Sequence, residues 1–203
     1  MLDKISTNEQ AADCVVLLHG YGANMYDLWS LKALFANKCV ISLEAPLPLE
    51  WGGFSWFDID FTPFGTEYDL KGLDKAIETV RDFLEGLQGK YNKIWLCGFS
   101  QGSIISHGIF LRYPHLIEGA ACLSGRFVES VFTEESKKAI PAKPLFVSHG
   151  TVDQVIAYKD GGEAIKEFYR DSEAGITFKK YHMGHEIIPQ CQVDIKNWFE
   201  ALN

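Results

Sequence analysis

The sequence has little of what a membrane, a secretory pathway or a disulfide framework would require. No run approaches the ~18 consecutive apolar residues of a membrane span, and the first thirteen residues, MLDKISTNEQAAD, lack the apolar core of a secretory signal. The five cysteines are odd in number and show no C-x-x-C spacing, so neither disulfides nor a zinc site is expected. These absences predict a protein of the reducing cytoplasm, without a transmembrane segment.

Positive charge is also scarce. The chain carries 19 lysines and arginines against 27 aspartates and glutamates, for a formal net charge of -8. Nucleic acids and anionic membranes select proteins with a basic face, so neither is expected as a partner. With 203 residues, of which 47% are hydrophobic and 23% charged, the composition is that of an ordinary globular protein. We expect one domain over residues 1–203.

Short apolar runs alternate with helical patterns along the chain. The pattern at 69–87 is the clearest, because Leu73, Ile77, Val80 and Leu84 recur at steps of three and four. Alternation of this kind predicts an α/β fold, with a mostly parallel central sheet and helices on both faces. The expected strands are 14–20, 39–45, 93–99, 119–125, 144–150 and 176–182, and the other expected helices are 25–36, 101–112, 158–171 and 187–202.

Segment 44–68 breaks this alternation. It contains three prolines, three glycines and seven aromatic residues in 25 positions, with no sustained period. Unstructured loops of this length are uncommon and tend to be lids or binding loops. The aromatic side chains suit the wall of an apolar pocket, a loop held to the core by its own rings, or the interface of a homodimer. The sequence does not rank these uses.

A serine stands between two glycines in GFSQG, residues 98–102, after an apolar run and before a helical pattern. In this context G-x-S-x-G is typical of a nucleophile elbow, a strained strand-to-helix turn that exposes the serine hydroxyl. Glycines are needed there because the neighbours of the serine crowd it. Ser100 is therefore the candidate nucleophile, at the carboxyl ends of the strands where α/β proteins bind ligands. A tight turn without chemistry is the alternative interpretation.

A serine nucleophile needs a histidine base and an acid that orients the base. In α/β hydrolases these follow in the order serine, acid, histidine. His185 lies beyond Gly184 at the mouth of the expected sheet, whereas His182 lies inside the last strand pattern, so His185 is the preferred base. Asp153 is the preferred acid because it lies in a loop just after a strand. The other candidates lie on helices, at helix ends, on the surface or out of order: His107, His115, His149, Asp160, Asp171 and Asp194.

The oxyanion of a tetrahedral intermediate must accept hydrogen bonds from backbone N–H groups. Gln101 is expected to supply one, because it follows the nucleophile at the start of a helix. The second is expected from the amide of Tyr21 in LHGYGAN, residues 18–24, where two glycines allow the backbone to turn inward. The same loop lacks the G-K-[ST] ending of a phosphate-binding loop. No metal or organic cofactor is expected.

Together these features resemble the carboxylesterase and acyl-protein thioesterase family of α/β hydrolases, also called the phospholipase/carboxylesterase family. The resemblance implies a compact α/β-hydrolase fold without a large cap domain. It also assigns the oxyanion hole to the amides of Tyr21 and Gln101. The matching stretches follow the family's order through nearly the whole chain: LLHGYGAN (17–24), SWFD (55–58), GFSQG (98–102), LSG (123–125), HGTVDQVI (149–156) and YHMGHE (181–186).

The resemblance further implies that Ser100, Asp153 and His185 form a catalytic triad. It places Trp56 and Phe57 in the wall of the substrate pocket. The expected protein is then a carboxylesterase, a serine hydrolase that cleaves ester or thioester bonds of short- to medium-chain acyl substrates through an acyl-enzyme intermediate. Its expected partner is a small-molecule or lipid-like acyl ester.

Three other functions remain open at this point. An acyl-protein thioesterase or lysophospholipase would act on long acyl chains with the same residues. A peptidase, or a lipase at a lipid surface, is not distinguished from an esterase by residue type. The least favoured interpretation is a hydrolase scaffold that only binds a small molecule or a protein, because such a scaffold commonly lacks a nucleophile or a base.

Overall fold

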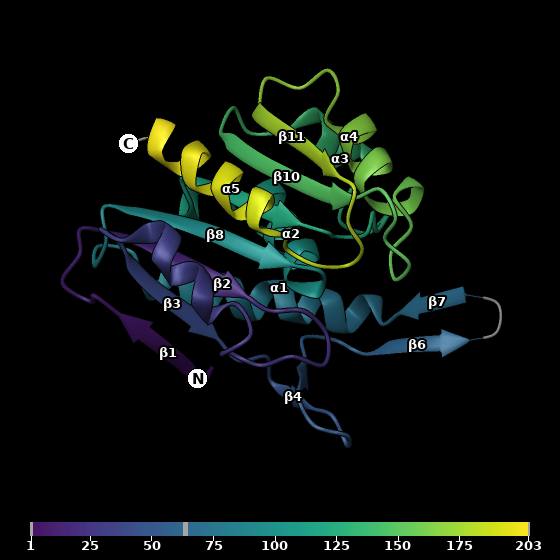
Figure 1. Ribbon diagram of the computed structural model, residues 1–203, viewed down its shortest axis with the longest axis horizontal. Coiled ribbons are helices and arrows are strands. Elements are labelled where there is room, and N and C mark those ends of the chain that lie inside the picture. Colours follow the sequence, from purple (N-terminus) through teal and green to yellow (C-terminus); the bar gives the residue numbers. More distant parts are fainter. Residues whose placement is uncertain (1, 63–64, 203) are drawn as a thin grey trace.

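The computed structural model describes residues 2–62 and 65–202, which form one seven-stranded sheet covered by helices (Figure 1). The strands of this sheet are β1 (Lys4–Thr7), β2 (Asp13–Leu18), β3 (Cys39–Leu43), β8 (Lys93–Phe99), β9 (Gly119–Leu123), β10 (Pro144–Gly150) and β11 (Gly175–Tyr181). They lie in the order β1–β3–β2–β8–β9–β10–β11. The edge strand β1 is antiparallel to β3, and all the other neighbours are parallel.

Helices cover both faces of the sheet. The α-helices α1 (Leu70–Glu85) and α2 (Gln101–Arg112) pack on one face, and the 3-10 helix η1 (Trp29–Phe35) and helix α5 (Pro189–Ala201) pack on the other (Figure 1). Strands β3 and β9 are buried along their whole length, as parallel strands between two layers of helices are expected to be. The smaller helical segments are η2 (Pro114–Leu116), α3 (Glu134–Lys138), η3 (Lys159–Glu163) and α4 (Ala164–Phe168).

The expected α/β fold is confirmed, and all six expected strands are present with ends within two residues of the prediction. Two expected helices differ. The segment 25–36 turns at Asn24, whose backbone and side-chain oxygens accept the N–H groups of Asp27 and Tyr26, so its helix begins only at Trp29 and is 3-10. The segment 158–171 contains a π-helical turn, η3, where Gly161 packs tightly against a buried histidine, and only then continues as α4.

The expectation of a loop without structure at 44–68 is wrong. The segment forms two small antiparallel ladders, β4 (Leu47–Pro48) with β5 (Phe54–Ser55) and β6 (Ile59–Thr62) with β7 (Gly65–Tyr68). Residues 63 and 64 lie outside the described residues. The ladders are too short to show a period in the sequence. The loop after β2 holds β5, because the N–H of Phe54 donates to the carbonyl of Ala23 and the carbonyl of Phe54 accepts the N–H of Gly22. The β6–β7 pair extends from one end of the molecule (Figure 1).

The order of the strands brings two loops together. From β2 the chain continues to β3 on one side, whereas from β8 it continues to β9 and β10 on the other side. The arrowheads of β2 and β8 point to the same edge of the sheet (Figure 1). A reversal of this kind leaves a crevice at the carboxyl ends of the two strands, where α/β proteins bind ligands.

Among residues 2–62 and 65–202, none of the helices combines the length and the hydrophobicity that a membrane span requires.

A substitution at Gly102 would test how closely α2 packs against β2. A Cβ atom at Gly102 would lie 2.0 Å from the carbonyl oxygen of Leu18, and both groups belong to the main chain of packed elements. We expect Gly102→Ala to lower the free energy of unfolding by on the order of 3 kcal/mol, measured by urea denaturation. The control is Gly86→Ala at the end of α1, where φ is -66° and the nearest neighbour of a Cβ lies at 3.4 Å. It should leave stability unchanged or slightly raised, and an equal loss in both variants would contradict the packing argument.

Candidate active site

Ser100 lies between β8 and α2 in a backbone conformation that residues other than glycine seldom adopt. Its φ is 54° and its ψ is -114°, a strained combination that costs about 1–3 kcal/mol. The flanking glycines make room for the turn, since a Cβ on Gly98 would lie 2.2 Å from the carbonyl oxygen of Gly102. The N–H of Ser100 donates to the carbonyl of Leu123 in β9 at 2.9 Å, which holds the turn against the sheet.

His185 lies in the loop after β11 and joins Ser100 to Asp153. Its Nε2 is 2.9 Å from Oγ of Ser100, and its Nδ1 is 2.8 Å from Oδ2 of Asp153. A neutral imidazole has one donor and one acceptor nitrogen, and an ionised carboxylate only accepts. The proton therefore lies on Nδ1, and Nε2 accepts the hydrogen bond of the serine hydroxyl. The ring of Phe99 packs against the imidazole with 4.9 Å between the centroids.

Asp153 is held by the turn that follows β10. The N–H groups of Val155 and Ile156 both donate to its Oδ1, each at 2.9 Å. The carboxylate is fully buried. One oxygen is thus occupied by the main chain, and the other faces His185.

His149 and His182, which the sequence also offers as bases, lie elsewhere. His149 approaches Asp153 rather than Ser100: its Nε2 is 3.6 Å from Oδ2 of Asp153 and donates to the carbonyl of Ile156 at 2.9 Å. Burial lowers the pKa of His149, so its ring is neutral near pH 7. His149 therefore braces the turn that carries the acid, while His182 is exposed.

A cleft of about 570 Å³ lies over Ser100 and His185. Its lining comes largely from the loop after β2, residues 20–27, and includes Phe99. A second hollow of about 280 Å³ lies beside the first and shares Asp27, Phe99 and His185 with it. The serine hydroxyl is therefore open to a small molecule.

The two residues expected to supply oxyanion amides lie beside Ser100. Gly20 packs directly on the serine, since a Cβ on Gly20 would lie 3.2 Å from the Cβ of Ser100, and Tyr21 follows it and lines the cleft. Gln101 is the first residue of α2, so its N–H has no carbonyl partner within the helix. This N–H also belongs to the positive end of the helix dipole.

His19 is a residue to which the sequence analysis gave no role, although it lies in the LHG stretch. It is fully buried, its Nε2 accepts the N–H of Ala45 at 3.1 Å, and its Nδ1 is 2.7 Å from the carbonyl oxygen of Gly20. Because Nε2 accepts, the proton must lie on Nδ1, which donates to Gly20. Burial lowers the pKa of His19 and keeps the ring neutral. His19 therefore fixes the peptide group between Gly20 and Tyr21.

Trp56 and Phe57 do not line the cleft, and the expectation that they form the pocket wall is wrong for this arrangement. Their side chains are only 2% and 0% exposed. The indole N–H of Trp56 donates to the carbonyl of His19 at 3.0 Å, and the two rings pack with 5.6 Å between their centroids. Trp56 therefore supports the loop after β2 from the inside, while the ring of Phe57 packs near that of Tyr68 with 6.1 Å between the centroids.

The buried side chain of Gln101 explains why the segment 55–57 turns toward the core. Its Oε1 accepts the N–H of Trp56 at 3.0 Å, and its Nε2 donates to the carbonyl of Phe57 at 2.7 Å and to Oγ of Ser55 at 3.2 Å. Gln101 thus has two roles: its main-chain amide is the expected oxyanion donor, and its side chain anchors the segment 55–57. The sequence predicted only the role of the amide, because the partners of the side chain are 44 to 46 positions away.

Acidic, histidine and cysteine side chains do not form a metal centre in the part of the chain that the structure describes, where no group of three or more could hold an ion. All five cysteines are free and buried. Burial raises the pKa of Cys97 to about 12, so its thiol stays protonated near neutral pH. The thiols pack as small apolar groups.

The sheet is mostly parallel, and a serine lies on a strained turn after a central strand. This serine is hydrogen-bonded to a histidine that is in turn hydrogen-bonded to an aspartate, both from later loops. Together these features define an α/β hydrolase. Comparison with known families leads to the same class. Residues 4–203 match the Phospholipase/Carboxylesterase family. The chain belongs to this family.

Individual relatives agree with the assignment. Carboxylesterase SOBER1 of Arabidopsis thaliana is 33% identical over 72% of this chain and 67% of its own length. Acyl-protein thioesterase 1 of Candida albicans is 30% identical over 81% of this chain and 80% of its own length. Among solved structures, esterase PE8 has a TM-score of 0.86 at 23% identity, covering 100% of this chain and 99% of that one. The carboxylesterase of Bacillus cereus has a TM-score of 0.81 at 19% identity, covering 100% and 95%. These structures share the fold.

The anchoring role of Gln101 can be measured as stability. Gln101→Ala keeps the main-chain amide but leaves the N–H of Trp56 buried without its partner, while the carbonyl of Phe57 loses one of two donors and keeps Oγ of Ser55. An unsatisfied buried group costs about 1–3 kcal/mol, so we expect the free energy of unfolding to fall by about that amount in urea denaturation. Gln190→Ala is the control, because this exposed side chain makes one bond to Asp194. A loss in Gln101→Ala no larger than in the control would contradict the anchoring role.

Proposed function

We propose that the protein is a serine carboxylesterase that hydrolyses ester or thioester bonds of short- to medium-chain acyl substrates. The observation that carries this proposal is the position of His185, 2.9 Å from Oγ of Ser100 and 2.8 Å from Oδ2 of Asp153. Nucleophilic catalysis by serine needs these two contacts. Membership of a family with relatives named carboxylesterase and acyl-protein thioesterase supports the reaction class.

In the proposed reaction His185 serves twice. Its Nε2 takes the hydroxyl proton as Oγ of Ser100 attacks the acyl carbon, and Asp153 stabilises the imidazolium that forms. The protonated Nε2 then gives this proton to the departing alcohol or thiol, which leaves the acyl group on Ser100. Water, deprotonated by the same nitrogen, then attacks the acyl-enzyme, and Nε2 returns the proton to Oγ of Ser100 as the carboxylic acid leaves.

The proposed oxyanion hole consists of the amides of Gln101 and Tyr21. A trans peptide is planar, so its C=O and N–H groups point in opposite directions. His19 holds the carbonyl of Gly20 on the buried side, which directs the N–H of Tyr21 away from the core, toward the side where Ser100 lies. Donors held in place before the reaction stabilise the oxyanion without the cost of reorienting them.

The lining of the cleft supports the short-chain substrate class. Asn24, Tyr26 and Asp27 lie beside Phe99 in its wall, a mixed lining that suits a short acyl group better than a long apolar chain. The aromatic residues Trp56 and Phe57, which could have formed an apolar channel, are instead buried in the core. Long-chain acyl-protein thioesterase activity is the second candidate, because relatives bear that name.

Initial rates on p-nitrophenyl esters from acetyl to palmitoyl test the proposal. We expect a maximum at two to six carbons for the wild type and loss of turnover in Ser100→Ala. Asp153→Asn should lower kcat on the order of 10⁴-fold, because the imidazole then favours the wrong tautomer. A maximum at eight or more carbons would support the long-chain alternative. No Ser100-dependent rate on any ester would refute the esterase and favour a binding protein.

The role of His19 predicts a difference between two substitutions. His19→Asn places an amide N–H where Nδ1 now bonds Gly20, whereas His19→Gln places one near the position of Nε2. We expect kcat to fall by roughly 10²-fold or more in His19→Gln, which loses the orientation of one oxyanion donor. His19→Asn should retain most of kcat, and KM should change little in either. Equal kcat values in two variants of equal Tm would show that the Gly20 hydrogen bond does not position the amide.

A further inference from the structure

Four of the segments at the carboxyl edge of the sheet contain acidic side chains and no basic ones. Segments 19–31, 44–69, 151–158 and 182–188, which follow β2, β3, β10 and β11, contain no lysine or arginine. The whole chain has 19 such residues, so this absence is local. The carboxylates in the four segments are Asp27, Glu44, Glu50, Asp58, Asp60, Glu67, Asp69, Asp153 and Glu186.

The basic residues near these segments contact other side chains and do not line the cleft. Arg126 follows β9, but its guanidinium lies 4.0 Å from Oδ2 of Asp160 and 5.7 Å from the ring centroid of Tyr68. Lys32 lies over the ring of Trp29 at 4.5 Å. Neither of these cations, nor any other lysine or arginine of the described residues, lines the cleft or the hollow beside it.

Two of the carboxylates line the hollows beside the nucleophile. Asp27 lies in the wall that both hollows share, and Glu186 directly follows His185. Both side chains are exposed, and neither has an ion-pair or hydrogen-bond partner among the residues the structure describes. Their charge is therefore available to a molecule in the cleft. Solvent screens this charge, but no basic side chain among the described residues pairs with it.

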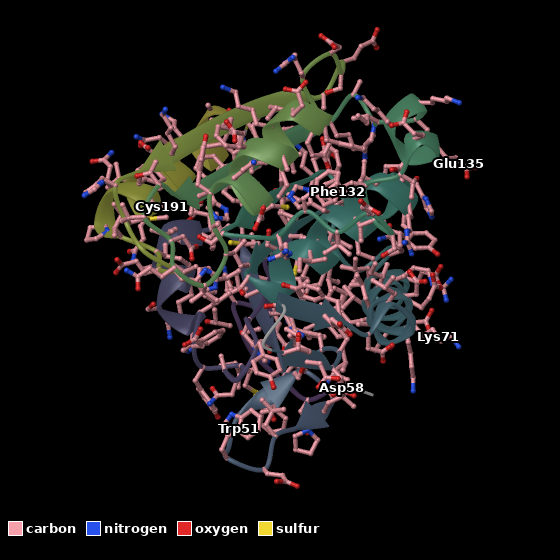
Figure 2. All side chains as sticks on the ribbon, turned by 90° about the vertical axis from the view of Figure 1, so that its right-hand side faces the viewer. Trp51, Asp58, Lys71, Phe132, Glu135 and Cys191 are labelled. Atoms are coloured by element: carbon pink, nitrogen blue, oxygen red, sulfur yellow. The ribbon has the colours of Figure 1, made fainter. Side chains whose placement is uncertain are left out.

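Aromatic rings at the rim complete the arrangement. Tyr26 lines the cleft and is 61% exposed, while Trp51 is 72% exposed with its ring 6.3 Å from that of Tyr21. Burial, and after it the charges of Asp58 and Asp60, raise the pKa of Tyr21, which lines the cleft. Figure 2 shows Trp51 and Asp58 at the same end of the molecule. Aromatic faces attract organic cations.

We propose that the substrate is an ester or thioester whose alcohol or thiol part carries a positive charge, such as a quaternary ammonium, bound by Asp27 and Glu186. The inference rests on the proposed function, because the proposed reaction requires the leaving group to lie beside His185. His185 must protonate the leaving atom, and the hollow lined by His185 also contains both carboxylates. The cation then lies between the two carboxylates, and the exposed ring of Tyr26 lies in the wall of the adjoining cleft.

Two thioesters of equal shape isolate the charge. Butyrylthiocholine and S-(3,3-dimethylbutyl) thiobutyrate differ by one quaternary nitrogen in place of carbon. We expect the wild type to have a kcat/KM about 5- to 30-fold higher for the cation at low ionic strength, from contacts with two exposed carboxylates and an aromatic ring. The ratio should fall in 0.5 M NaCl, where screening extends over only a few ångströms.

Matched variants assign the effect to the cleft. Asp27→Asn combined with Glu186→Gln should bring the ratio of the two kcat/KM values close to one. Glu135→Gln combined with Glu173→Gln removes the same charge from exposed positions outside the cleft (Glu135 is labelled in Figure 2) and should leave the ratio high.

Three results would overturn the proposal, and they differ from one another. A wild-type ratio near one, with the neutral thioester hydrolysed, would remove the charge preference and leave the esterase intact. A high ratio that survives in the Asp27 and Glu186 variant would remove these residues as its source. Failure of a folded wild type to hydrolyse either thioester, or any p-nitrophenyl ester, would remove the esterase function itself.

Discussion

The main-chain contact between β2, β8 and α2 is the constraint on which the site depends. The carbonyl of Leu18 lies against Gly102, and the carbonyl of Gly102 lies against Gly98, at distances that leave no room for a Cβ atom. Helix α2 can therefore start directly behind the central strand, and Ser100 is forced into its strained turn. The same closeness puts the loop after β2 beside the serine, since Gly20 packs on it.

Buried hydrogen bonds then hold the loops around the serine in one arrangement. His19 binds Gly20 and Ala45, Trp56 binds the carbonyl of His19, and Gln101 binds the main chain of Trp56 and Phe57. This network joins the loop after β2, the segment 55–57 and the first residue of α2. Buried polar groups of this kind specify one structure when all of them are paired, so the geometry beside the nucleophile does not depend on surface loops alone.

Patterns within a short stretch predicted most of the sheet, the turn at Ser100 and the candidates Asp153 and His185, because strand burial, glycine spacing and chain order are local or sequential signals. The inward position of Trp56 and Phe57 was not predictable, because it depends on Gln101, more than forty positions away. The role of His19 was hidden for the same reason, since Ala45 is its distant partner. One domain, a cytoplasmic location and a homodimer stay predictions.

The absence of basic side chains around the cleft also affects how a turnover would end. Hydrolysis of an uncharged ester creates a carboxylate at the serine, beside Asp27 and Glu186 and within a chain of net charge -8. Like charges at close range repel, and among the residues that the structure describes no lysine or arginine lines the cleft to retain the new anion. The negative charge around the cleft would then repel the acid product, and accumulated product would inhibit the enzyme only weakly.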